Sequence, residues 1–427
     1  MGLSRKKAME GFKTLASVDE ALGELLRRVT HRPEVVERPI EDALAHVAAE
    51  DVTSPTDFPP FDRSAVDGYA VIASDTLGAS LTNPVVLAVK YQVDPGTDPG
   101  RLEPLRHGEA AVIFTGAPLP PGADAVVMAE DAIVQGDRVF VTRQVSPYQN
   151  VSRRGEDFTK GKPVIRRGQI VRPWHIGALA SLGIAKIKVY RPVRVAIIST
   201  GDEVVDLPPE GGLPGPGKII NSTKPLLKAL LRLDFFEPID LGTVPDDADR
   251  ISSLIREGLG KADAVITTGG TSIGAKDLVA EAVARVGEVV FNGVRMRPGK
   301  PTGAGVAGGK PIFMLSGFPV AALAGYMAFV RPTLRHMTGT PEDPAPVVRG
   351  KITRRVANVA GVRTYLRVRV IAGKDGYLVE PLAITASGVL STLTDANGLL
   401  VIPENVEGYD EGDEVEVVLI GPPLEAY

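Results

Sequence analysis

The sequence has 427 residues, well above the usual size of one domain, so we expect two to four domains with a sizeable core. Its formal net charge of −4 argues against a general binder of nucleic acid or of an anionic membrane. There is no cysteine, which excludes disulfide bonds, thiolate zinc sites and cysteine nucleophiles. No long apolar run follows the basic residues near the N-terminus, so we expect a cytoplasmic protein.

The N-terminal quarter of the chain predicts helices. Ser17 precedes an amphipathic run, and Glu20 follows it three residues later, which is the pattern of a capping box at a helix start. A second helix is expected from Pro39 to about residue 50, since proline is favoured in the first helical turn.

Short β-branched runs separated by proline, glycine and aspartate then follow, which predicts a mostly β segment. A short helix and a strand are expected after it. The alternation indicates one domain interrupted by another. We therefore assign residues 1–56 and 150–191 to an interrupted linker domain and residues 57–149 to a β-rich insert domain.

From Arg194 onward strands alternate with helices of about ten to fifteen residues. This pattern predicts a doubly wound α/β domain over residues 192–338, with parallel strands joined by right-handed crossovers. After a proline-rich linker, alternating strands over residues 339–427 predict a small β-barrel or a β-sandwich. The fold class expected is thus a multidomain α/β protein.

Residues 311–330 carry no charge and are long enough to span a membrane. However, the sequence from Ser316 to Pro319 contains glycine and proline after a short apolar run. We therefore expect a strand, a tight turn and a buried helix rather than a transmembrane helix.

Ligands of open parallel sheets bind at the carboxyl ends of the strands, so the loops at these ends are the candidate site. Five loops are expected there: Thr200–Glu203, Pro245–Asp247, Gly269–Gly274, Arg295–Pro301 and Ser316–Pro319. Their side chains are chemically complementary. The glycine-rich loop offers backbone N–H groups for a phosphate, and the arginines and lysine offer positive charge for an oxyanion. The acids are hard oxygen ligands suited to Mg²⁺.

Each loop also has a purely structural interpretation. The Gly269–Gly274 segment could be only a tight turn, and the basic run from Arg295 a solvated loop. Asp247 and Asp277 could be acids favoured in the first turns of helices. The shared position at strand ends favours the functional interpretation.

Seven motifs, in order along the chain, resemble those of the molybdopterin molybdenumtransferases, the family of bacterial MoeA and of the gephyrin E domain. They are Asp57–Val71 (DFPPFDRSAVDGYAV), Thr115–Asp131, Arg154–Asp157 (RGED), Ser199–Val204 (STGDEV), Gly269–Gly274, Arg297–Pro301 (RPGKP) and Ser387–Pro403. With the domain alternation, the resemblance covers essentially the whole chain.

The resemblance implies an elongated homodimer of four-part chains, with a molybdopterin-binding α/β domain and a C-terminal β-barrel. It implies an active site between the α/β domain of one subunit and the insert of the other. The implied reaction is insertion of molybdate into adenylylated molybdopterin with release of AMP, with Mg²⁺ as the metal. Neither nucleic acid nor a membrane is an expected partner.

The resemblance also implies site residues at the positions that match the motifs. The catalytic positions implied are Asp62, Thr115, Glu203 and Asp277, and the metal-binding positions are Glu203, Asp246 or Asp247, and Asp277. The substrate-binding positions implied are Gly269, Gly270, Thr271, Ser272, Gly274, Arg297, Lys300, Pro301, Ser316 and Ser391. Asp62 and Thr115 also have local interpretations, as a turn-capping carboxylate and a turn hydroxyl.

The sequence departs from the family pattern at three places. Arg297 stands where lysine is frequent, Phe318 stands in SGFP where PGNP is common, and Arg63 replaces a common asparagine. An arginine keeps the charge and adds a planar fork for an oxyanion, whereas the loss of the asparagine amide removes an expected ligand contact.

Two other activities remain open at this point. The α/β domain resembles the fold that adenylylates molybdopterin, although the insert and barrel favour molybdate insertion. A partner-binding scaffold, as in gephyrin, is disfavoured because no appended domain accompanies the motifs. The sequence does not distinguish molybdate from tungstate, which are tetrahedral dianions of nearly equal size.

Overall fold

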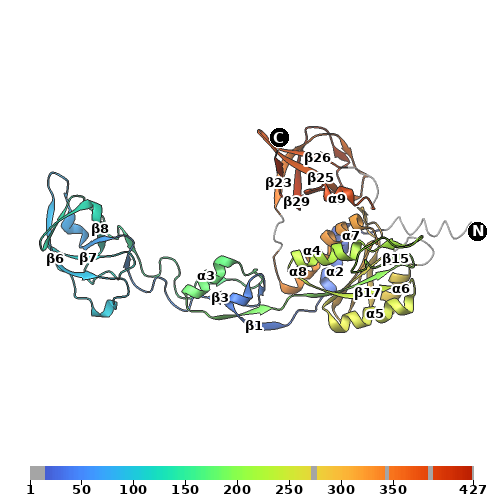
Figure 1. Ribbon diagram of the computed structural model, residues 1–427, viewed down its shortest axis with the longest axis horizontal. Helices are drawn as coiled ribbons and strands as arrows, with labels where there is room; N and C mark the ends of the chain where they lie inside the picture. Colours follow the sequence, from blue (N-terminus) through green and yellow to red (C-terminus); the bar gives the residue numbers. More distant parts are fainter. Residues whose placement is uncertain (1–14, 271–276, 342–345, 383–387, 426–427) are drawn as a thin grey trace, which may run out of the picture.

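The computed structural model describes residues 15–270, 277–341, 346–382 and 388–425. The molecule is elongated, with a β-rich unit at one end and an α/β unit with a second β unit at the other (Figure 1). A small linker unit lies between them, and the chain passes through it twice. Among the described residues, no helix has the length and apolar character needed to cross a membrane.

The linker unit is built from two separate stretches of chain. Strand β1 pairs with β13 in antiparallel register, from Val35 opposite Tyr190 to Pro39 opposite Lys186, and β13 also pairs with β2. The elements are β1 (Val35–Pro39), the 3₁₀ helix η2 (Ile40–Ala43), β2 (Val47–Ala48), β3 (Val52–Thr53), β12 (Pro163–Ile165), α3 (Pro173–Ser181) and β13 (Lys186–Tyr190).

The predicted helix from Pro39 to residue 50 is wrong. Only the turn Ile40–Ala43 is helical, as a 3₁₀ turn, and Ala45 has a left-handed φ of 65°. The flanking residues instead pair with β13, so the sheet formed with a distant part of the chain overrides the local helical pattern.

The insert has a six-stranded sheet in the order β8-β5-β7-β6-β10-β9, and β11 pairs with β4 in a separate two-stranded sheet. Neighbouring residues such as Ala110 and Ala111 belong to different apolar clusters, so both faces of the sheet are covered. The elements are β4 (Arg63–Ser64), β5 (Gly68–Val71), η3 (Ala73–Thr76), β6 (Val85–Val93), η4 (Pro99–Arg101), β7 (Glu109–Ile113), β8 (Ala125–Met128), η5 (Ala129–Asp131), β9 (Ala132–Gln135), β10 (Arg138–Val141) and β11 (Val151–Ser152).

The α/β unit has a six-stranded sheet in the order β17-β14-β18-β22-β21-β19. Its helices are α2 (Val18–Arg28), α4 (Thr223–Leu233), α5 (Ala248–Lys261), α6 (Leu278–Ala284), α7 (Pro319–Gly325), the π-helical η6 (Tyr326–Val330) and α8 (Arg331–Thr338). Its strands are β14 (Arg194–Thr200), β15 (Val204–Val205), β16 (Ile219–Ile220), β17 (Glu237–Val244), β18 (Ala264–Thr268), β19 (Glu288–Asn292), β20 (Met296–Arg297), β21 (Gly303–Ala307) and β22 (Lys310–Leu315).

Both faces of this sheet are covered by helices, as a doubly wound fold requires. Along β14, Val195 packs in one apolar cluster and Ala196 in the other. The first cluster includes residues of α2, α4 and the α7–α8 segment, and the second those of α5 and α6. Helix α2, with the predicted capping box at Ser17, thus packs on the α/β unit.

The sheet is mixed rather than wholly parallel. Strands β17, β14, β18 and β22 are parallel, but β21 runs antiparallel to both β22 and β19. The expectation of parallel strands joined by crossovers missed β21, because its sequence GAGVA has little β-branched character.

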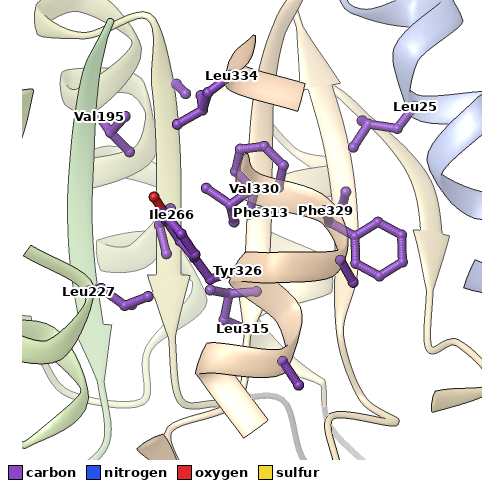
Figure 2. Close-up of a cluster of buried hydrophobic side chains, with 14 of the residues drawn as sticks. Leu25, Val195, Leu227, Ile266, Phe313, Leu315, Tyr326, Phe329, Val330 and Leu334 are labelled. Atoms are coloured by element: carbon purple, nitrogen blue, oxygen red, sulfur yellow. The ribbon is translucent and has the colours of Figure 1, made fainter. Parts of the chain in front are cut away.

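The charge-free stretch 311–330 is buried inside this unit. It forms most of β22, a turn, and the helical segment that carries Tyr326 and Phe329. Figure 2 shows these two rings beside Phe313 of β22, and all three side chains are fully buried. The prediction of a strand, a turn and a buried helix is confirmed.

The C-terminal unit is a closed barrel, so of the two architectures expected from the sequence the β-barrel is correct and the β-sandwich is not. Strand pairing runs β25-β26-β23-β29-β27 and returns from β27 to β25. The elements are β23 (Val347–Ile352), β24 (Val356–Ala357), β25 (Arg363–Gly373), β26 (Gly376–Pro381), α9 (Ser391–Thr394), β27 (Gly398–Ile402), β28 (Gly408–Tyr409), β29 (Glu414–Leu419) and β30 (Leu424–Glu425). Strand β20 of the α/β unit pairs with β25 and so attaches the barrel to that unit.

Candidate functional site

The candidate site lies at one edge of the α/β sheet. The parallel strands β14, β17, β18 and β22 end there, and β19, which has the same direction, leads into the basic loop. The loops touch one another. The N–H of Gly269 donates to the carbonyl of Leu315 at 3.2 Å, and the N–H of Asp246 donates to Asp202 Oδ1 at 3.3 Å. The sequence prediction that these loops share one edge therefore holds.

The turn after β18 requires glycine at two positions. Gly269 and Gly270 have φ values of 88° and 61°. A Cβ on Gly269 would lie 2.2 Å from the carbonyl oxygen of Thr200, and one on Gly270 would lie 2.7 Å from Thr200 Oγ1. The backbone of this turn can therefore lie close to the end of β14 only because Gly269 and Gly270 have no side chains. The remaining predicted members of this loop, Thr271, Ser272 and Gly274, lie outside the described residues.

A pocket of about 230 Å³ opens beside this turn. Thr200 and Thr268 line it from the strand ends, and Asn221 lines it from the segment before α4. Phe318 and Leu390 complete it from the turn before α7 and from the barrel unit. The pocket is therefore lined both by the edge of the α/β sheet and by the C-terminal motif Ser387–Pro403, which contains Leu390.

A larger pocket of about 650 Å³ lies elsewhere, between the linker and α/β units. Val193 and Glu237, which line it, stand at the opposite ends of β14 and β17 from the candidate loops. Because ligands of open α/β sheets bind at the carboxyl ends of the strands, we place the candidate site at the smaller pocket.

The predicted metal-binding acids have different local roles. Asp247 caps α5, since its carboxylate accepts the N–H of Arg250 at 2.9 Å. Asp277 caps α6 through the N–H of Ala280 at 3.0 Å and also accepts Asn292 Nδ2 at 2.9 Å. The carboxylates of both residues are therefore committed to local structure.

Asp246 and Glu203 differ from these helix caps. They are exposed, as Asp247 is, but their carboxylates cap no helix among the described residues. A Cβ on Gly270 would lie 3.8 Å from Asp246 Oδ1. Across the described parts of the chain, no three His, Asp or Glu side chains cluster as a preformed metal site. Mg²⁺ in phosphate-processing sites usually takes one or two carboxylates plus substrate oxygens and water, so two exposed carboxylates fit this ion.

The basic loop lies against the barrel. Arg297 ends β20 opposite Thr364 of β25, and the turn after it closes through the N–H of Thr302 to the carbonyl of Gly299 at 2.8 Å. Lys300 and Pro301 stand within this turn, with Lys300 exposed. The structure thus carries the predicted basic side chains to the junction of two units.

Arg367 joins this junction, and sequence reasoning missed it. Its side chain is 4% exposed, and its Nε donates to Thr392 Oγ1 at 3.1 Å. Burial and the neighbouring charge of Arg297 lower the pKa of Arg367. No local pattern reveals this residue, because it lies on the outward side of β25 and its partner Thr392 belongs to α9, a separate segment of the chain.

The predicted serines differ in their surroundings. Ser391 is exposed at the start of α9, one residue before the Thr392 that holds Arg367. Ser316 is buried, and its Oγ accepts the N–H of Phe318 at 3.2 Å, which fixes the turn before α7. Ser391 is therefore available to a ligand, whereas Ser316 has a local structural partner.

The predicted residues of the insert are held by motif partners. Asp62 Oδ1 accepts the N–H of Arg154 at 2.7 Å, so the RGED segment fixes it. Thr115 donates its N–H and its hydroxyl to Asp67 Oδ1, each at 2.7 Å. These two bonds lower the pKa of Asp67, which sequence reasoning left unassigned although it lies in the DGYA motif.

The insert residues do not meet the α/β residues within one chain. Figure 1 places β6, β7 and β8 of the insert and the α/β unit at opposite ends of the molecule. Asp62 and Thr115 belong to the insert, while Glu203 and Asp246 belong to the α/β unit. The predicted residues thus form two groups.

Comparisons with known proteins cover nearly the whole chain. Residues 16–183 match the MoeA N-terminal region (domain I and II), residues 196–336 a probable molybdopterin binding domain, and residues 349–420 the MoeA C-terminal region (domain IV). The crystal structure of a molybdopterin biosynthesis MoeA protein from Pyrococcus horikoshii is 37% identical, with a TM-score of 0.78 over 95% of this chain and 99% of that one.

Two relatives of similar length agree with this match. A protein of Methanocaldococcus jannaschii named for molybdopterin biosynthesis is 39% identical over 97% of this chain and 100% of its own. A molybdopterin molybdenumtransferase of Staphylococcus aureus is 34% identical over 94% of this chain and 95% of its own. The chain therefore belongs to the MoeA family of molybdopterin molybdenumtransferases, enzymes of molybdenum cofactor biosynthesis.

Proposed function

We propose that this chain inserts molybdate into adenylylated molybdopterin, releases AMP and leaves molybdenum on the dithiolene sulfurs, with Mg²⁺ bound at the site. The observation that carries the proposal is the pair of arginines at the junction of the α/β unit and the barrel. Arg297 lies opposite Thr364 on β25, the strand that carries the buried Arg367, and the charge of Arg297 contributes to lowering the pKa of Arg367. Two neighbouring guanidinium groups repel each other, and an oxyanion between them relieves that repulsion.

Molybdate is a suitable occupant of this junction because it is a compact dianion. Arg297 and Arg367 offer planar forks of N–H donors, which match a tetrahedral oxyanion better than a lysine does. Lys300 adds a third positive charge on the same turn. The exposed hydroxyl of Ser391 at the start of α9 supplies a neutral hydrogen bond beside Thr392.

Asp246 and Glu203 are the residues that would hold Mg²⁺. Both are exposed at the sheet edge. The metal, when bound, neutralises charge on the phosphate oxygens of the adenylate. Asp247 and Asp277 orient the helices that follow them, and their carboxylates already accept N–H groups there. This assigns Asp246 rather than Asp247 as the ligand within the pair.

The site would be completed by a second copy of the chain. Asp62 and Thr115 lie far from their own α/β unit, at the other end of an elongated molecule (Figure 1). In a homodimer with twofold symmetry, the insert of each subunit can reach the α/β unit of the other. The hydrogen bonds from Arg154 and to Asp67 hold Asp62 and Thr115 in fixed positions for that contact.

AMP release from adenylylated molybdopterin by the purified chain tests this proposal. We expect release to require both molybdate and Mg²⁺. If the chain instead converts ATP and molybdopterin into the adenylate, the adenylyltransferase activity is the correct one. If neither reaction occurs, the proposal is wrong. Tungstate added in competition with molybdate identifies the preferred oxyanion.

A further inference from the structure

The hydroxyl of Thr200, at the end of β14, has no hydrogen-bond partner among the residues that the structure describes. The residue is only 2% exposed, so bulk solvent does not reach the hydroxyl. A buried hydroxyl without a partner costs about 1–3 kcal/mol, and such groups are rare in folded proteins. A feature with this cost needs an explanation.

Loose packing does not explain it, because equivalent hydroxyls on the adjacent strand are satisfied. Thr267 Oγ1 donates to the carbonyl of Phe313 at 3.1 Å, and Thr268 Oγ1 donates to Ser199 Oγ at 3.0 Å. Among the described residues, the buried hydroxyls of Thr302 and Thr333 also lack a partner, but of these three threonines it is Thr200 that lines the pocket of about 230 Å³. It is also the one of these that meets the Gly269–Gly270 turn, where a Cβ on Gly270 would lie 2.7 Å from its Oγ1.

Thr200 lines the pocket of about 230 Å³, and the chemistry of that pocket indicates its ligand. Among the described residues that line it, no side chain is charged. Phe318 and Leu390 supply apolar surface, while Asn221 and Thr268 supply neutral polar groups. A phosphate or an oxyanion would find no counter-charge among these residues, whereas a neutral, flat heterocycle meets both kinds of surface.

The size of the pocket limits it to part of the substrate. Pockets that enclose a whole drug-sized molecule measure roughly 300–1,000 Å³, so this one holds a fragment. In molybdopterin the neutral, flat fragment is the pterin ring, and the phosphate and dithiolene are the charged parts. The arginine junction suits the charged parts and the pocket suits the ring.

We infer that Thr200 positions the substrate by a hydrogen bond from its hydroxyl to a polar edge atom of the pterin ring. The inference rests on the proposed function, because it takes molybdopterin as the ligand. Thr200 lines the pocket, so the inference requires only that its hydroxyl turns toward the ring when the ring binds. The ring then supplies the partner that the free protein lacks.

The test compares three variants of the full chain. Thr200→Val removes the hydroxyl and keeps the β-branched shape, Thr200→Ser keeps the hydroxyl, and Thr267→Val removes a satisfied hydroxyl nearby. The affinities for molybdopterin and for 6-hydroxymethylpterin, a fragment without phosphate, are measured by equilibrium dialysis. The temperature of thermal unfolding is measured without ligand.

We expect Thr200→Val to weaken binding of both probes about fivefold to tenfold, the value of one hydrogen bond. We expect its unfolding temperature to stay unchanged or to rise, because an unsatisfied buried group is removed. Thr200→Ser should bind like the wild type. Thr267→Val should bind like the wild type but unfold at a lower temperature, since it breaks a formed hydrogen bond.

Two results overturn the inference and leave the proposed function intact. One is equal binding of both probes by Thr200→Val and wild type. The other is a drop in unfolding temperature for Thr200→Val as large as that for Thr267→Val, which would make the hydroxyl a structural group. A wild-type chain that binds no molybdopterin overturns the inference and the proposed function together.

Discussion

At the scale of single residues, the aspartates of the site separate by their local hydrogen bonds. The sequence places Asp246 and Asp247 side by side and offers no reason to prefer either. In the structure Asp247 caps α5, while Asp246 faces the Gly270 turn. The choice depends on where α5 begins, which sequence patterns locate only to within a few residues.

This difference predicts unequal effects of two adjacent substitutions. Asp246→Asn should lower Mg²⁺-dependent AMP release on the order of 100-fold and raise the Mg²⁺ concentration needed, because it removes a carboxylate ligand. Asp247→Asn should keep most of the activity, because asparagine caps a helix about as well as aspartate. Steady-state AMP release as a function of Mg²⁺ checks this. A larger loss in Asp247→Asn would reverse the assignment.

The basic loop offers a second comparison between neighbours. Both arginines are exposed, but Arg297 lies opposite Thr364 on β25, the strand that carries the buried Arg367. Arg295 instead lies 3.8 Å from its ion-pair partner Glu20. Arg297→Ala should raise the KM for molybdate by about 10- to 100-fold, the value of a hydrogen bond to a charged group. Arg295→Ala is the control and should leave this KM nearly unchanged. Equal effects of the two would point to general electrostatic attraction rather than to a defined subsite.

Some residues of the candidate site could be proposed from the sequence, and others could not. Gly269, Gly270 and Arg297 could be assigned because strand ends and charge patterns are local features. Arg367 and the orphan hydroxyl of Thr200 could not, because both depend on which segments come to lie against them. Burial of a charge by a distant segment of the chain leaves no local pattern in the sequence.

At the scale of elements, strongly periodic segments were predictable and short ones were not. Helix α4 (Thr223–Leu233) has 11 residues, within the length range expected for the helices after Arg194, and the predicted capping box at Ser17 forms. The segment after Pro39 failed because its pairing partner, β13, lies about 150 residues away in the sequence. Pairing over such a distance decides short elements more strongly than helix propensity does.

Asp263 joins the elements of the linker and α/β units. It is 1% exposed just before β18, and it accepts two hydrogen bonds from Arg191, which follows β13. His31 Nε2 lies 2.7 Å from its Oδ1. Burial alone raises the pKa of this carboxyl, but these partners outweigh it and lower the pKa from 3.8 to about 2.

The pH dependence of unfolding follows from this shift. A carboxyl whose pKa is lower in the folded state than in the unfolded state stabilises the protein at pH values above its unfolded pKa of 3.8. This stabilisation is lost as the pH falls toward the folded pKa of about 2. Between pH 5 and pH 2, the wild type should lose about 2 kcal/mol more unfolding free energy than Asp263→Asn. The unfolding free energy is measured at each pH by urea unfolding, followed by the helical circular dichroism signal.

The control for this measurement is Asp375→Asn, which replaces an exposed carboxylate in the turn between β25 and β26. It should follow the wild-type pH dependence. If Asp263→Asn follows the wild type as well, Asp263 does not provide the acid-sensitive link between the two units.

At the scale of the whole molecule, the linker keeps the insert and the α/β unit apart. The motifs in the sequence indicate which segments contribute residues to the site, but they do not indicate how far apart these segments lie in the folded chain. The paired strands β1 and β13 carry the chain out to the insert and back, so one chain separates the two groups of residues (Figure 1). This separation is the basis for our proposal that the insert of a second copy completes the site.

The central claim is that each site combines the α/β unit of one subunit with the insert of its partner. The most direct test is AMP release by a heterodimer of Asp62→Ala and Asp246→Asn chains, purified through two different affinity tags. Each variant alone should be nearly inactive. The heterodimer has one intact composite site, so the account predicts about half of the wild-type molybdate-dependent AMP release per dimer. A heterodimer no more active than either parent would contradict it.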